Sequence, residues 1–208
     1  MAGNPARANK VRERRERIAS AALDLFARQG YAQTTIDQIA EAAGVSRRTA
    51  FHHFPTKEAM LIDHFLGRRE DAIRHLEERP RSEPPIVSLY RVLRAQCELG
   101  YDRAVLAQIR AVLGAEPEIV GSQLQLGIRA FQQQLVDVLE APSIPDRSSV
   151  EIRSVTLMAT GWFVTAAHVY LVENRPSLVD CFDEAVETCL RWTVEDLTAD
   201  DPAARLDG

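Results

Sequence analysis

Hydrophobic residues recur along this chain with the spacing of an α-helix almost everywhere. Ile18, Ala22 and Leu25, for example, follow one another at intervals of four and three, which places them on one helical face. No stretch alternates apolar and polar residues between turn residues, as a half-buried strand does. The pattern therefore predicts an all-α protein.

Glycine and hydroxyl-bearing residues separate the predicted helices near the N-terminus. A first helix of about 20 residues ends at Gly30, which suits a left-handed C-cap. Thr34 and Thr35 offer an N-cap to a short helix that ends at Gly44, and Ser46 offers the N-cap of the next one. Two short helices joined by three residues have the spacing of a helix-turn-helix, which we predict over residues 35–54.

Prolines mark the breaks in the rest of the chain. Three of them within residues 79–85 predict a boundary between subdomains. Beyond it we predict helices at 86–99, 102–113, 117–140, 149–173 and 178–195. With the helix that begins near Lys57, they form a bundle of about six helices.

These breaks define four predicted segments. Residues 1–9 are too polar and too short to pack, so we predict a disordered basic arm. Residues 10–56 form the helix-turn-helix domain, residues 57–198 form the helical bundle, and residues 199–208 form a flexible tail. The charged N-terminus lacks the apolar core of a signal peptide, so a cytoplasmic location is expected.

Residues 154–172 carry no charge and are long enough to span a bilayer. Serine, threonine and histidine interrupt this segment, and its apolar residues fall into two opposed stripes. We therefore expect a soluble helix with one side toward its own core and the other toward a partner. Together with the helix at 178–195, this helix is expected to form the interface of an obligate dimer. The predicted interface residues are Val164, Leu171, Phe182 and Val186.

Charge is distributed unevenly along the chain. Residues 1–60 hold ten Lys or Arg against six Asp or Glu, a net charge of +4, and residues 61–208 hold 15 against 24, a net charge of −9. The basic part includes Arg12, Arg14, Arg15 and Arg17. A basic module on an acidic body is typical of a protein that binds a polyanion such as DNA, although a solvated charged helix gives the same balance.

The second helix of the motif would present Arg47, Arg48, Thr49 and His52. Two arginines at its N-terminal end can grip guanine or phosphate in the major groove, and Thr35 can place its hydroxyl at a phosphate. An ordinary corner between helices is the alternative, but a helix dipole disfavours cations at this end.

Residues 30–46, with Thr49, residues 51–55 and residues 57–58, resemble the DNA-binding domain of TetR-family transcriptional regulators. The resemblance implies a cytoplasmic homodimer on a palindromic operator of double-stranded DNA. It also implies that residues 57–198 bind a small, largely apolar effector, which releases the DNA, and form the dimer. The implied DNA contacts are Thr35, Ser46, Arg47, Arg48, Thr49, His52, His53 and Lys57.

Two residues depart from the family's pattern. Arg48 stands where a small residue is common, so the helix is expected to reach bases by side chain. Phe51 stands where tyrosine is common, so it lacks a hydroxyl for phosphate, and we expect its ring to pack on Phe54.

No catalytic motif, cofactor site or metal site is predicted. His52 and His53 are adjacent and diverge on a helix, and the three cysteines form no CxxC pair, as expected in a reducing compartment. The helical bundle therefore indicates a binding module. Its candidate pocket residues, each of which would also suit an ordinary core, are Cys97, Tyr101, Gln108, Phe131, Met158, Trp162 and His168.

Two other classes of protein fit the same features. An architectural DNA-binding protein without an effector would lack the preference of about a thousandfold or more that a regulator shows for its operator. A helical ligand carrier or enzyme with an incidental basic domain would lack salt-sensitive DNA binding altogether.

Overall fold

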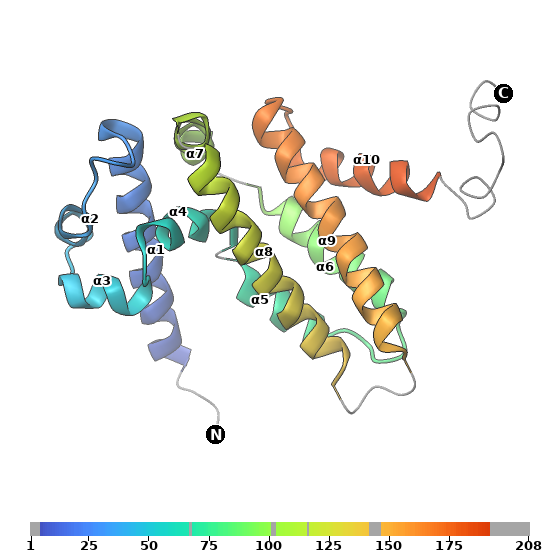
Figure 1. Cartoon of the computed structure of the whole chain (residues 1–208). Helices are drawn as coiled ribbons and strands as arrows, with labels where there is room; N and C mark the ends of the chain where they lie inside the picture. The colour runs from blue at the N-terminus through green and yellow to red at the C-terminus, as the bar shows by residue number, and fades with distance from the viewer. Residues whose placement is uncertain (1–4, 67, 101–102, 116, 142–146, 192–208) are drawn as a thin grey trace. The chain divides into compact units, whose positions relative to one another are not determined.

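The computed structural model describes residues 5–66, 68–100, 103–115, 117–141 and 147–191. These residues form α-helices joined by short turns, without a strand among them, which confirms the predicted all-α fold (Figure 1). Contacts within the chain group it into two compact units. The first unit comprises residues 1–81 and 101–147, and the second unit comprises residues 82–100 and 148–208.

The first unit is built around its N-terminal helix. Its helices are α1 (Pro5–Gln29), α2 (Ile36–Ala42), α3 (Arg47–His53), α4 (Lys57–Leu66), α5 (Arg69–Glu77), α7 (Arg103–Ala115) and α8 (Pro117–Leu139). Helix α1 packs against α2, α4 and α7, while α4 and α5 pack against α8. Ile18, Leu23, Ile39 and Phe54 are fully buried in this core, so the short helices α2 and α3 are anchored by apolar contacts.

The second unit consists of α6 (Pro85–Glu98), α9 (Ser149–Val172) and α10 (Leu178–Leu190), with α9 packed against both others. Phe182 of α10 is fully buried and its ring stacks on Tyr90 of α6 at 5.9 Å between centroids. Among the described residues, α9 is the one helix long and apolar enough to cross a membrane by length and composition. Its buried Thr156 and Thr160 donate to backbone carbonyls one turn earlier at 2.7 Å, so their hydroxyls are satisfied inside the unit.

Several boundaries differ from the predicted ones. Helix α1 begins at Pro5, where proline suits the first turn, so residues 5–9 are helical rather than part of a disordered arm. The predicted domain boundary at residue 57 is not a boundary between the compact units, because α4 packs on α1 within the first unit. Residues 1–4 and the predicted tail at 199–208 lie outside the described residues.

Candidate nucleic-acid interface

Hydroxyl caps fix the starts of both α2 and α3. The Thr35 hydroxyl accepts a hydrogen bond from the Gln38 backbone N–H at 3.3 Å, and the Gln38 side-chain oxygen accepts one from the Thr35 N–H at 2.8 Å. The Ser46 hydroxyl accepts one from the Thr49 N–H at 3.1 Å and starts α3. Both predicted N-caps are thereby confirmed. Gly44 between them has a φ of 64°, which a residue without a Cβ adopts freely.

Helix α3 has one buried and one exposed face. Ala50 is fully buried, whereas Arg47, Arg48, Phe51 and His52 are exposed. Their spacing of one, three and one residues gathers them on a single face of the helix. This face combines two guanidinium groups, an imidazole and an apolar ring, and a helix of this width fits the major groove of DNA.

Arg47, on this face, makes only a weak ion pair within the domain. Its guanidinium donates to the Asp37 carboxylate at 2.7 Å and lies 5.5 Å from the centre of the Phe51 ring. Both partners of the ion pair are more than half exposed, with 61% and 62% of their side chains accessible. Such a pair contributes at most about 1 kcal/mol, so a phosphate or a base edge can displace Asp37.

Arg15 joins three helices beneath the interface. It donates through Nε and a terminal nitrogen to one oxygen of Asp63 at 2.9 and 2.7 Å, and through its other terminal nitrogen to the His53 carbonyl at 3.1 Å. Its guanidinium also lies 4.3 Å from the centre of the buried Phe54 ring. Asp63 is only 8% exposed. Arg15 therefore ties α1 to the end of α3 and to α4, a role that the charge pattern alone did not predict.

The side chain of Lys57 is hydrogen-bonded to the turn between α1 and α2. Its ammonium donates to the carbonyls of Tyr31 and Thr34 at 2.8 and 2.9 Å and lies 4.2 Å from the centre of the Tyr31 ring. The Tyr31 hydroxyl in turn donates to Glu58. Two of the three ammonium donors are thus used within the domain, so Lys57 positions the base of the interface whether or not it also meets phosphate.

His52 and His53 end α3 with rings whose centroids are 5.6 Å apart. The pKa of His53 lies below its ordinary value because partial burial disfavours the charged ring and because His52, Arg14 and Arg15 repel a positive charge there. At neutral pH, His53 is therefore a neutral ring that offers a hydrogen bond rather than a charge to a phosphate.

A family model described as "Bacterial regulatory proteins, tetR family" matches residues 18–63, which run from the middle of α1 through α3 into α4. Over this segment the chain matches the DNA-binding domain of the TetR family. Curated relatives include the HTH-type transcriptional regulator TcmR of Streptomyces glaucescens, 38% identical over 104 residues, and RutR of Escherichia coli, 45% identical over 56 residues. The matches cover 50% and 27% of this chain, and 42% and 26% of those relatives, so the chain spans less than half of their length.

Solved structures extend the TetR-family fold over most of the chain. The FadR repressor of Thermus thermophilus, in complex with lauroyl-CoA, is 24% identical with a TM-score of 0.50, covering 91% of this chain and 98% of FadR. FadR of Bacillus subtilis, in complex with stearoyl-CoA, is 20% identical with a TM-score of 0.52, covering 83% of this chain and 95% of that one. At these identities the likeness concerns the fold.

The residues predicted to line a pocket of this chain are distributed over both units. Gln108 donates to Asp24 of α1, and Phe131 is buried on α8, both in the first unit. In the second unit Cys97 is buried, and burial raises the pKa of its thiol to about 12. Met158 and His168 lie on the exposed face of α9. Tyr101 lies outside the described residues.

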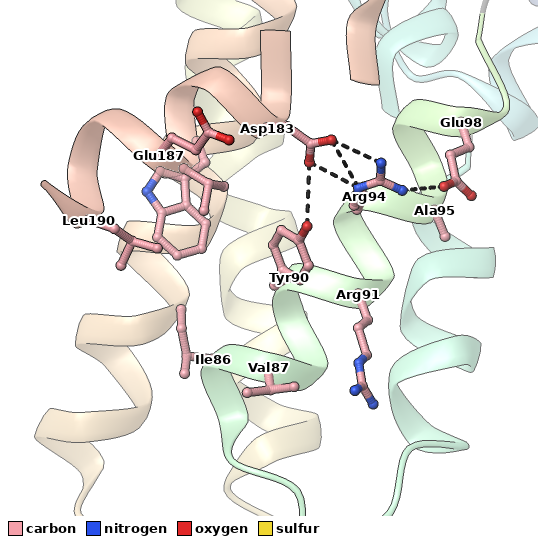
Figure 2. A pocket seen from close by; sticks show the side chains of 12 residues that line it. Ile86, Val87, Tyr90, Arg91, Arg94, Ala95, Glu98, Asp183, Glu187 and Leu190 are labelled. Carbon is pink, nitrogen blue, oxygen red and sulfur yellow. Dashed lines mark hydrogen bonds and ion pairs between the residues drawn. The ribbon is translucent and has the colours of Figure 1, made fainter. Parts of the chain in front are cut away.

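Of that predicted set, Trp162 does line a cavity within the second unit. An open groove of about 830 Å³ runs between α6 and α10, with Ile86, Val87 and Leu190 on its apolar walls (Figure 2). Arg94 spans its edge, donating to both oxygens of Asp183 at 2.9 and 3.2 Å and also to Glu98 (Figure 2). Periodicity identified these helices as apolar but not which of their faces would border the groove.

The residues predicted to form the dimer interface mostly face inward. Phe182 is fully buried, so its ring belongs to the core of its own subunit, and Val186 lines the groove. Leu171 is buried as well, and Val164 is half-buried. The exposed apolar side chains of α9 are instead Val150, Leu157, Met158 and Val172. Prediction of Phe182 as an interface residue was wrong because the apolar stripe of α10 packs on α6 and α9.

Proposed function

We propose that this chain is a DNA-binding transcriptional regulator of the cytoplasm, which binds a palindromic operator as a homodimer and is released by a small, largely apolar effector. The exposed face of α3 carries the proposal: Arg47, Arg48 and His52 project from a helix whose start is fixed by a hydroxyl cap. This face offers donors to guanine and phosphate without requiring the whole chain to be basic. The residues around it, Thr35, Thr49, His53 and Lys57, would meet the backbone or position the helix.

Replacing Arg48 with alanine tests the role in DNA recognition. Operators would first be selected by the full-length protein from random duplex DNA, and wild type should prefer them over random sequences by about a thousandfold or more. Arg48→Ala should lose about 1 to 3 kcal/mol of preference at one base pair, because a side chain that reads a base edge is removed. Its binding to random DNA should change little, as measured by fluorescence anisotropy.

Arg175→Ala is the matched control, since it removes the same charge from an exposed ion pair in the second unit. It should leave operator preference unchanged. Equal losses by Arg48→Ala on operator and random DNA would place Arg48 on the phosphate backbone and contradict its role in base recognition. Equal affinity of wild type for all sequences would favour the architectural alternative, and the absence of salt-sensitive DNA binding would favour the carrier or enzyme.

We propose the groove between α6 and α10 as the surface for the effector. Its walls are mainly apolar, and Trp162 lines it while only 4% exposed. The indole Nε1 of Trp162 is buried and has no hydrogen-bond partner among the described residues. A buried donor without a partner costs free energy, which an effector with an oxygen acceptor on an apolar body would recover.

Trp162→Phe tests this site because it keeps an apolar ring and removes the donor. Compounds would be screened for release of labelled operator from wild type, and an active compound would then be titrated against the variant. Loss of one neutral hydrogen bond should raise the concentration needed for release by about three- to tenfold. Operator affinity without compound should stay the same. Superimposable release curves for wild type and Trp162→Phe would exclude the indole as a contact for that effector.

The dimer is proposed to form through the exposed face of α9. Leu157, Met158 and Val172 on that face, together with Leu190 of α10, are large apolar side chains left exposed within one chain. Exposed apolar surface of this kind is typical of a subunit interface. Gly161 lies on the same exposed face and would let the backbones of two α9 helices approach closely.

A further inference from the structure

Phe51 is the one large apolar side chain on the exposed face of α3 among the described residues, and 41% of it is accessible. The predicted packing of Phe51 on Phe54 is not what the structure shows. Phe54 is fully buried with its ring against Arg15, whereas Phe51 lies beside the Arg47 guanidinium. The core therefore leaves Phe51 exposed, and its ring is held at the surface next to a predicted DNA contact.

The position of Phe51 limits what it can recognise. On the same helical face Arg47, Arg48 and His52 carry N–H donors, but the phenyl ring has neither a donor nor an acceptor for a base edge or a phosphate. In the major groove, acceptors and amino groups of the bases are matched by polar side chains. The thymine 5-methyl group is the apolar feature there, and it is matched by apolar contact.

We infer that Phe51 recognises thymine, with its ring packed on the 5-methyl group of one thymine in each half-site of the operator. This inference rests on the proposed function and adds a specificity-determining residue to it. The Arg47 guanidinium lies 5.5 Å from the ring centre, so the ring is the immediate neighbour of a predicted DNA contact. The thymine would therefore lie next to the base or phosphate that Arg47 binds.

The experiment replaces each thymine of a selected operator, one at a time, with 2′-deoxyuridine. This change preserves base pairing and removes only the methyl group. At one position in each half-site, wild-type protein should bind about fourfold more weakly, as expected for loss of burial of one methyl-sized group. Phe51→Ala should bind the thymine and deoxyuridine operators equally at that position. Phe51→Tyr, which keeps the ring, should retain the discrimination.

Controls separate this effect from damage to the domain. Phe51→Ala should unfold at the wild-type temperature because the side chain is exposed, and Val11→Ala, which shortens another exposed apolar residue on α1, should leave discrimination intact. Wild type that is indifferent to deoxyuridine at every position would overturn the inference, as would discrimination that persists in Phe51→Ala. A selection that enriches no sequence would overturn the proposed function and this inference with it, whereas an enriched operator insensitive to deoxyuridine would overturn the inference alone.

Discussion

Arg15→Ala should destabilise the helix-turn-helix domain by about 2 to 4 kcal/mol, because it leaves the carboxylate of Asp63 buried without its cationic partner. Asp63 is buried while Arg15 is 29% exposed, so the cost lies toward the lower end of the range for broken buried ion pairs. The variant also removes the bond to the His53 carbonyl at the end of α3. Operator binding should therefore fall together with stability, although Arg15 is not placed among the DNA contacts.

Chemical denaturation of the full-length protein, followed by circular dichroism, measures the effect. Arg12→Ala is the matched control, since its Nε lies 3.8 Å from Glu16 and both side chains are more than half exposed. It should change the free energy of unfolding by less than about 0.5 kcal/mol. Adding Asp63→Asn to Arg15→Ala should recover part of the loss by removing the unpaired charge. Equal free energies of unfolding for Arg15→Ala and Arg12→Ala would show that the contacts of Arg15 with Asp63 and His53 do not stabilise the domain.

Gly161→Arg should break the dimer and with it the binding of the palindromic operator. A Cβ at Gly161 would meet no described atom within 4 Å, so an arginine side chain can be accommodated without a clash inside its own subunit. Any loss of dimerisation would then come from a clash with the partner subunit. A two-fold axis through α9 would bring two such charges together in an apolar interface, which costs several kcal/mol and weakens dimerisation by about a hundredfold or more. Operator affinity should fall because each half-site would then be bound by an untethered domain.

Gly114→Arg is the control, because Gly114 is also a helical glycine at which a Cβ would meet no described atom within 4 Å, but it lies on α7. Sedimentation velocity at micromolar concentration should show monomers for Gly161→Arg and dimers for wild type and Gly114→Arg. Circular dichroism should show that both variants are folded. Dimers of Gly161→Arg that bind operator as wild type does would exclude the exposed face of α9 as the interface.

Local chemistry accounts for the parts of the interface that could be predicted from the sequence. Thr35 and Ser46 could be recognised as N-caps because their hydroxyls bond to backbone N–H groups only three residues away. The role of Arg15 in joining three helices could not be recognised, because its partner Asp63 is 48 residues distant and no periodic pattern links the two. Lys57 similarly has the sequence position of a DNA contact, but its ammonium is directed to the carbonyls of a preceding turn.

Helix α9 shows the limit of hydrophobic periodicity. The sequence contains two opposed apolar stripes, one expected to face the core and the other a partner. Met158 and Trp162 share one stripe, but only Trp162 is buried. Leu157 and Leu171 share the other, but only Leu171 is buried, because the packing of α6 and α10 decides which residues are covered. The same dependence on neighbouring helices explains why Trp162 was placed at a groove but Phe182 was misplaced at an interface.

A footprint of the purified full-length protein on the DNA flanking its own gene tests the central claim most directly. If the exposed face of α3 recognises sequence within a dimer, we expect one protected region at physiological salt. That region should contain two inverted half-sites whose centres lie about 34 Å apart or somewhat more, roughly one turn of B-DNA. Protection should disappear with Gly161→Arg and persist with Gly114→Arg. Uniform protection along the DNA, or none at any concentration that saturates random duplex, would contradict the account.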